Sequence, residues 1–164
     1  MIRVNLKSFV TDGRFGPIAF GNSREALVSL LGQPEGYGPE MNGRAWWWDY
    51  GDVRFGWDVT GNNCLQSIHV LLQGNALPTG GDVIELMPWF ARRGESRKAV
   101  ETMLKAEGIA FDRVREGWDA GFVRVAVGVG VRLTFNEGKS SESCPLGLLG
   151  LEYSPAFPRL KSSR

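Results

Sequence analysis

Apolar side chains recur every three or four positions in two segments of the chain, which predicts two amphipathic helices. The first predicted helix covers residues 23–31. Asn22 precedes it as a candidate N-cap, Glu25 stands at the capping-box position, and Gly32 follows as the C-cap. These residues mark both ends of the first helix.

The second predicted helix covers residues 97–107, with Ser96 as its N-cap and Gly108 at its end. Its sequence corresponds to that of the first helix. The string Ser-Arg-x-Ala-Leu-x-Ser-Leu-Leu that begins at Ser23 aligns with Ser-Arg-x-Ala-Val-x-Thr-Met-Leu, which begins at Ser96. The alignment indicates that one helical unit occurs twice.

After each helix the apolar period changes to two, which is typical of β-strands. The predicted strands are 46–49, 53–58 and 68–72 after the first helix, and 109–115, 122–127, 131–136 and 148–153 after the second. Val-Arg-Phe-Gly-Trp at 53–57 also matches Val-Arg-Leu-Thr-Phe at 131–135. We therefore predict an α+β fold built from two tandem copies of a helix packed on an antiparallel sheet. The alternative is that the matches are chance, because caps and alternation recur in any α+β protein.

The expected division of the chain follows from these two units. The first helix-plus-sheet unit is predicted at 1–77, a junction at 78–94, the second unit at 95–158 and a flexible tail at 159–164. The junction contains Gly- and Pro-rich turns. Two more strands are predicted, a first strand at 1–7 and a short one at 82–86.

Alternation also assigns side chains to the two faces of each predicted strand. An antiparallel sheet covered by one helix layer has one core face and one face open to water or a partner. The side chains expected on the core face are Val53, Phe55, Trp57, Ile68, Val70, Leu72, Val131, Leu133 and Phe135. The open face then carries Arg54, His69 and Arg132.

The run Trp46-Trp47-Trp48 breaks this simple division, because three successive side chains cannot share one face of a strand. If Trp46 and Trp48 belong to the core, Trp47 points outward, near Asp49, Arg54 and His69. Each indole offers roughly 150–250 Å² of burial. Either another part of the chain covers the outward tryptophan, or it forms an aromatic patch that faces a partner.

Composition narrows the classes of function. The chain has 164 residues, 43% of them apolar, and a net charge of +1. This charge does not indicate nucleic-acid or membrane-surface binding, and no apolar run approaches the roughly 20 residues of a membrane helix. Since the amino terminus does not resemble a secretory signal, we expect a cytoplasmic protein. Cys64 and Cys144 are then expected to be free thiols, with a disulfide as the alternative.

Catalytic and metal-binding patterns are not evident. His69 is the single histidine of the chain and lies in an alternating apolar strand, where a structural role is commoner than general-base catalysis. Asp49, Asp52 and Asp58 surround a predicted hairpin, as turn acids commonly do. The segment 128–130, Gly-Val-Gly, has no helix after it and predicts a turn. We therefore expect no enzyme activity, no cofactor and no metal.

Several segments resemble a group of small bacterial proteins, some of which occur as immunity proteins beside secreted toxins. The segments are Phe-Gly-Asn-Ser-Arg-Glu-Ala at 20–26, Leu-Gly-Gln-Pro at 31–34, Trp-Asp-Tyr-Gly-Asp-Val-Arg-Phe at 48–55, Leu-Gln-Ser-Ile at 65–68, Leu-Lys-Ala-Glu-Gly-Ile at 104–109 and Gly-Val-Arg-Leu-Thr-Phe at 130–135. The order of elements is also similar to that of tandem-repeat inhibitors of β-lactamase. Those inhibitors are secreted and carry a disulfide in each repeat, whereas this chain has one cysteine in each half. The resemblance implies an antiparallel architecture and inhibition of a protein, and it assigns no functional residue.

We predict a protein-binding module, in its most concrete form an immunity-type inhibitor that neutralises a toxin or enzyme through an open sheet face. Tryptophan and arginine dominate binding energy at protein interfaces. The residues predicted to contact the partner are Trp47, Arg54, His69 and Arg132. The alternative is a scaffold that binds a small molecule or peptide in a cleft between the two units, lined by Trp57, Trp89 or Trp118. The oligomeric state stays open.

Overall fold

The computed structural model describes residues 1–41, 43–72, 77–87, 89, 94–114, 122–127, 130–136 and 147–155. In this part of the chain it contains three helices, α1 (Leu6–Asp12), α2 (Arg24–Leu31) and α3 (Arg97–Ala106). They accompany a large antiparallel sheet, so the predicted α+β class is confirmed.

The large sheet has the strand order β2-β5-β6-β7-β12-β11-β10-β9, and each described neighbouring pair is antiparallel. Its strands are β2 (Gly36–Tyr37), β5 (Trp47–Tyr50), β6 (Val53–Trp57), β7 (Leu65–Leu71), β9 (Phe111–Val114), β10 (Phe122–Val127), β11 (Val131–Asn136) and β12 (Gly147–Tyr153). Two smaller pairs accompany it, a parallel one of β1 (Ile2–Asn5) with β8 (Ile84–Met87) and an antiparallel one of β3 (Glu40–Met41) with β4 (Arg44–Ala45).

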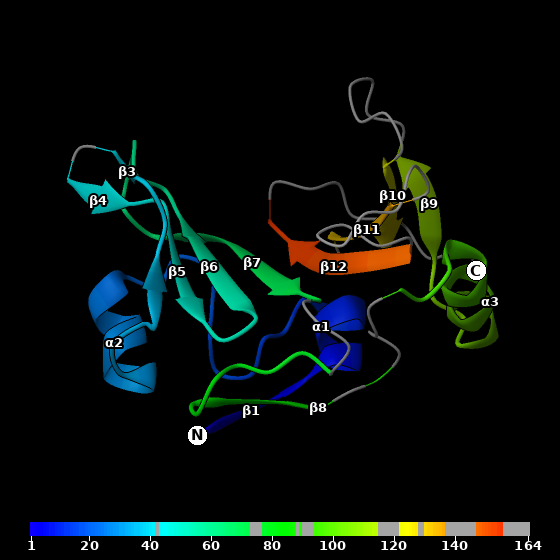
Figure 1. The fold of residues 1–164 in the computed structure, drawn as a ribbon, viewed down its shortest axis with the longest axis horizontal. Helices are drawn as coiled ribbons and strands as arrows, with labels where there is room; N and C mark the ends of the chain where they lie inside the picture. Colours follow the sequence, from blue (N-terminus) through cyan, green and yellow to red (C-terminus); the bar gives the residue numbers. More distant parts are fainter. Residues whose placement is uncertain are drawn as a thin grey trace.

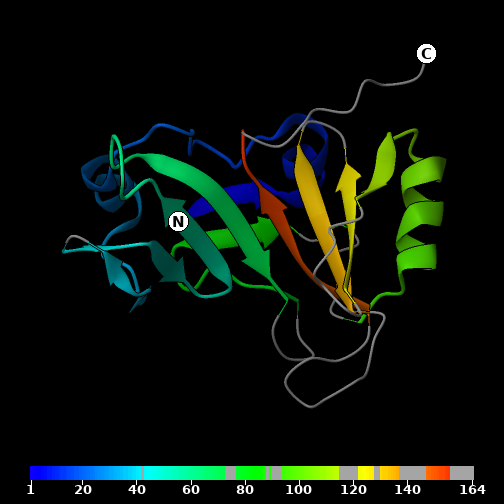
Figure 2. The ribbon, with the colours of Figure 1, turned by 90° about the horizontal axis from the view of Figure 1, so that it is seen from above.

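The helices follow one side of the large sheet (Figure 1). α2 lies beside β5 and β6, α1 lies below the junction of β7 and β12, and α3 stands next to β9 at the far end (Figures 1 and 2). The junction joins the strands of the two predicted units, because β7 pairs with β12 from Ile68 to Leu71. The predicted units therefore share one continuous sheet. Tandem copies and the limits 1–77, 78–94 and 95–158 stay predictions.

The centre of the core forms where α1 meets this junction. Phe9 of α1 is fully buried and makes edge-to-face contacts with Phe15 and Tyr153. Gly13 ends α1 with a positive φ of 71°, and a Cβ there would lie 2.8 Å from the Tyr153 ring. Only glycine combines this backbone conformation with such a close approach. α1 is therefore fixed to the sheet at its middle.

Two local predictions are corrected by capping geometry. The first strand ends at Asn5 and not at residue 7, because the Asn5 side chain accepts hydrogen bonds from the amides of Lys7 and Ser8 and thereby starts α1. The N-cap of α2 is Ser23, whose hydroxyl accepts a hydrogen bond from the Ala26 amide. Asn22 instead accepts one from the amide of Ala19, so its side chain stabilises the preceding turn.

The remaining strand predictions lie within a few residues of the observed bounds, and the face assignment of the core strands is confirmed. The buried side chains are those expected, Val53, Phe55, Trp57, Ile68, Val70, Leu72, Val131, Leu133 and Phe135. The predicted strand at 82–86 is observed at Ile84–Met87, where it pairs with β1. Residues 128–129, Cys144 and the predicted tail 159–164 lie outside the described residues.

None of the helices in the described ranges is long and apolar enough to cross a membrane.

Candidate binding site on the open sheet face

The register of the sheet aligns polar side chains in one row across the face opposite the core. Asp49 pairs with Arg54, Arg54 with His69, His69 with Glu152, and Glu152 with Arg132, on five neighbouring strands. Acidic and basic groups alternate along much of this row. Three of the four predicted contact residues therefore share one line on the open face, although they come from distant parts of the sequence.

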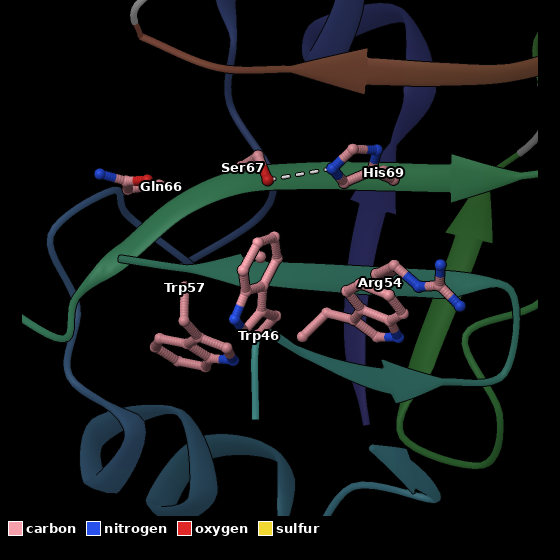
Figure 3. Close-up of a pocket in the computed structure, with 8 residues that line it drawn as sticks. Trp46, Arg54, Trp57, Gln66, Ser67 and His69 are labelled. Carbon is pink, nitrogen blue, oxygen red and sulfur yellow. Dashed lines mark hydrogen bonds between the residues drawn. The ribbon is translucent and has the colours of Figure 1, made fainter. Parts of the chain in front are cut away.

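A cavity of about 280 Å³ opens at the β5–β6–β7 end of this row. Three tryptophans and four polar residues line it, together with Gly56: Trp46, Trp47, Trp57, Arg54, Gln66, Ser67 and His69. Figure 3 shows Ser67 and His69 on β7 along one side, with Trp46 and Trp57 on the other. The structure thus brings Trp47, Arg54 and His69 together, whereas Arg132 lies outside the cavity, two strands from His69.

Arg54 is held in place by two neighbours. Its Nε and one Nη atom donate to the two carboxylate oxygens of Asp49, over 2.8 and 3.0 Å. Its guanidinium carbon lies 4.5 Å from the centre of the Trp47 ring. A two-point ion pair and ring stacking together fix the orientation of a side chain that would otherwise be mobile. Arg54 therefore presents a preformed surface.

His69 lies between a hydroxyl and a carboxylate. Its Nε2 atom is 2.9 Å from the Ser67 hydroxyl oxygen and 3.8 Å from a carboxylate oxygen of Glu152. Burial is the main cause that lowers the pKa of His69, and the charge of Arg54 lowers it further, while Glu152 and Asp49 oppose the shift. The imidazole is therefore neutral at pH 7.

The three successive tryptophans have three different environments. Trp48 belongs to the core, Trp47 is half-buried beneath Arg54, and Trp46 is 43% exposed. The possibility that both Trp46 and Trp48 belong to the core is wrong for Trp46. β5 begins only at Trp47, so the regular alternation of the strand does not extend to Trp46. The expected outward direction of Trp47 toward Arg54 and His69 is confirmed.

Two glycines make room for this arrangement. A Cβ on Gly38 would lie 2.3 Å from the Trp47 ring, so the backbone of this segment packs directly against the indole. A Cβ on Gly56 would lie 2.2 Å from the Ser67 hydroxyl oxygen. Gly56, the residue before the last of β6, therefore leaves space for the Ser67 hydroxyl beside the cavity.

Behind the cavity, a buried arginine supports Trp57. The guanidinium carbon of Arg24 lies 4.7 Å from the Trp57 ring centre and 4.9 Å from that of Trp48. Its Nε donates to the side-chain oxygen of Asn63 over 2.9 Å, and an Nη atom donates to the carbonyl of Ala45. Burial and then Arg44 lower the pKa of Arg24. No role for Arg24 was predicted from the sequence. Its position directly after the N-cap Ser23, in a half of the chain rich in tryptophan, was the signal that could have indicated one.

The carboxylates near the first hairpin have structural partners. Asp52 accepts a hydrogen bond from the Thr79 amide, and Asp58 accepts bonds from the amides of Thr60, Gly61 and Asn62. The bond from Gly61 is the main cause that lowers the pKa of Asp58. Within the described residues no cluster of three histidine, cysteine or acidic side chains could hold a metal.

The other predicted residues lie apart from this site. Trp89 is half-buried, with the Lys7 ammonium 5.8 Å from its ring centre, and does not line the cavity. Trp118 lies outside the described residues. Trp57 lines the cavity, but every lining residue belongs to the predicted first unit, so the cleft between the two units stays a prediction. Cys64 is half-buried and has no disulfide partner within the described part of the chain.

Fold and site together define an α+β protein with an aromatic and polar cavity on the open face of an antiparallel sheet. No protein-family model, no curated protein and no solved structure matches the chain.

Proposed function

We propose that this chain is a protein-binding module that covers a partner with the open face of its sheet, and that an immunity-type inhibitor of a toxin or enzyme is its most concrete form. One observation carries the proposal. Trp46, Trp47, Arg54 and His69 surround one cavity on a sheet face that the helices do not cover. Tryptophan and arginine are the residues that most often dominate the energy of protein interfaces.

The size of the cavity favours a protein partner over the small-molecule alternative. Ligand pockets generally measure about 300–1,000 Å³ and enclose most of the ligand. This cavity, at about 280 Å³ and open on the sheet surface, suits one anchoring side chain of a larger partner. The surrounding row, which includes Glu152 and Arg132, would supply the polar rim of a standard interface of about 800 Å² per partner.

Preorganisation supports the same function. Arg54 is already ordered in the free chain, because Asp49 and Trp47 fix it from two sides. Complex formation therefore costs less conformational entropy at this side chain. The net charge of +1 gives no general attraction to nucleic acid or to a membrane surface. The chain would therefore recognise its partner through the shape and the specific contacts of this surface. We further propose that the protein acts in the cytoplasm.

Tandem duplication is part of the proposal. The supporting features are the repeated Ser-Arg helix start, the matched strands β6 and β11, and the strand order, in which β5-β6-β7 and β10-β11-β12 meet through their last strands. The cavity described above lies on the open face of the first half. In the second half Ala126 and Asn136, which lie on that face, are buried. We therefore assign the main contact to the first half.

The test is capture of binding proteins from the source organism with tagged full-length variants. Arg54→Ala and Trp47→Ala should each weaken the partner's binding by about 2 kcal/mol, roughly 30-fold in Kd. Arg3→Ala is a matched control, because Arg3 forms an exposed ion pair with Glu85 away from the large sheet. Trp89→Ala is the control for the loss of an indole.

Stability is measured on the same variants. Arg54→Ala should change the free energy of unfolding by less than about 1 kcal/mol, since the pair with Asp49 is partly exposed. The proposal is rejected if a stoichiometric partner binds the Arg54 and Trp47 variants as tightly as it binds the controls. It is also rejected if no protein is captured by any variant.

A further inference from the structure

We propose that the cavity between Trp46, Trp47 and His69 takes the side chain of a tyrosine from the partner protein. This inference rests on the proposed function and specifies the chemistry of its anchor. It follows from three properties of the cavity: its compensated charge, its aromatic walls and its single polar side.

The charges in the cavity are compensated before any partner arrives. Arg54 is neutralised by the two-point ion pair with Asp49, and its face is covered by the Trp47 ring. Burial lowers the pKa of His69, so the imidazole adds no charge at neutral pH. Among the residues that line the cavity, Arg54 is already paired with Asp49, so a lysine or an acidic side chain would lose hydration on entry without gaining an unpaired opposite charge from them. The occupant is therefore uncharged.

The walls select a flat apolar group. Trp46 is 43% exposed, and Trp57 is buried behind it with Arg24 stacked on its ring. Figure 3 shows the rings of Trp46 and Trp57 on the same side of the cavity. Aromatic rings pack well against one another in offset or edge-to-face geometry. An aromatic side chain fits these walls better than an aliphatic chain does.

The opposite side selects a polar tip. The Ser67 hydroxyl lies 2.9 Å from His69 Nε2, and Gly56, opposite it on β6, adds no side chain to obstruct it. A hydroxyl can rotate to donate or to accept, so this pair can bond to a group that does both. The phenol of tyrosine has an apolar ring and a hydroxyl at its tip, which matches the two sides of the cavity. Phenylalanine would leave the bond between Ser67 and His69 intact but would gain no hydrogen bond of its own on this side.

The experiment uses the full chain labelled with ¹⁵N and follows the indole N–H signals of its tryptophans by NMR. Trp46→Phe and Trp47→Phe variants assign the two signals of interest. The probe is N-acetyl-tyrosinamide, compared with the corresponding amides of phenylalanine, lysine and aspartate, and with methyl glucoside. We expect the tyrosine probe to shift both signals with a Kd of roughly 1 mM, and the phenylalanine probe to bind about fivefold to tenfold more weakly.

Ser67→Ala supplies the second readout. It should weaken the tyrosine probe to the level of the phenylalanine probe and leave the phenylalanine probe unchanged. Equal binding of the two aromatic probes, tighter binding of a charged probe or of the glucoside, or no shift with any probe would each overturn the assignment.

The two proposals can fail separately. A captured partner that depends on Arg54, together with a tyrosine probe that does not bind, rejects the tyrosine anchor and leaves the protein-binding function. A tyrosine probe that binds as expected, together with no partner that depends on Trp47, rejects the function and leaves the chemistry of the cavity.

Discussion

The helices α2 and α3 begin with the same capping pattern but contact the sheet through different interactions. Each has a serine N-cap whose hydroxyl accepts a hydrogen bond from an alanine amide three residues on, over 3.2 Å, and each continues with an arginine. In α2 that arginine, Arg24, is buried between two indole rings. In α3 the corresponding Arg97 joins Arg113 in holding a buried carboxylate, Glu101. Equal local sequence therefore specifies the helix start and not its tertiary contacts.

The difference has a physical consequence for how each helix responds to solution conditions. The contacts of Arg24 are to aromatic faces, a carbonyl and an amide, none of which titrates in acid. The contacts of α3 depend on the charge of Glu101, which two arginines stabilise. The α2 attachment should therefore resist acid, whereas the α3 attachment should weaken in it.

The largest expected effect is that of removing the buried cation. Arg24→Met keeps much of the side-chain volume but removes the hydrogen bonds and the stacked charge, and we expect a loss of about 3 kcal/mol in the free energy of unfolding. Arg24→Lys should recover less than half of it, because an ammonium cannot reproduce the planar contacts. Urea unfolding measures both values. A loss below about 1 kcal/mol would show that the aromatic pair holds α2 without the arginine.

A smaller effect, of about 2 kcal/mol at pH 7, is expected for Glu101→Gln, since charge-assisted hydrogen bonds to two arginines are lost. Hydrogen bonding from Arg113, followed by that from Arg97, lowers the pKa of Glu101 to about 2 in the folded chain, although burial opposes the shift. A depressed folded pKa gives stability that is present above the ordinary value near 4.5 and is lost as the pH falls toward 2.

The pH dependence separates this cluster from that of Arg24. The difference between the Glu101→Gln variant and the natural chain should shrink from pH 5 to pH 2, when both are unfolded by urea across that range. The effect of Arg24→Met should change much less over the same range, because the acidic neighbour that its charge influences, Glu25, is exposed. A constant difference for Glu101→Gln would contradict the role of its charge.

The smallest effect concerns the carboxyl end of α2. The Tyr50 hydroxyl donates to the carbonyl of Gly32 over 2.8 Å, and burial raises the pKa of Tyr50 to about 12. Tyr50→Phe should cost about 1 kcal/mol. Because the folded pKa is raised, the natural chain should lose stability as the pH rises above 10, and the variant should lose less. Thermal unfolding at pH 8 and pH 10.5 compares the two, and parallel losses would exclude this contribution.

Sequence periodicity predicted the features that depend on near neighbours. Caps placed the ends of α2 and α3 to within a residue or two, and alternation put Trp47, Arg54 and His69 on one face. Periodicity could not predict the order of the strands in the sheet, because an alternating pattern is compatible with any neighbouring strand and any register. α1 was missed because it is only seven residues long, so its start depends on one cap, Asn5.

The candidate site shows the same limit. The cavity requires Gly56 opposite Ser67 and Trp57 supported by Arg24, and each pair joins residues from different elements. Arg132 was predicted on the open face and lies there. The sequence could not show that it lies two strands away from His69, because this separation depends on the pairing of β7 with β12. Whether it contacts a partner stays a prediction.

The β7–β12 pairing also determines how this chain can fold during synthesis. Leu71 pairs with Gly150, so the two middle strands of the sheet come from the middle and the end of the chain. Pairing across such a long loop is slow, and it cannot occur until the final strand has left the ribosome. Until then β7 is an unprotected edge, open to pairing with other chains. We therefore expect a chain that ends before residue 147 to aggregate, even though its first half retains every residue of the cavity.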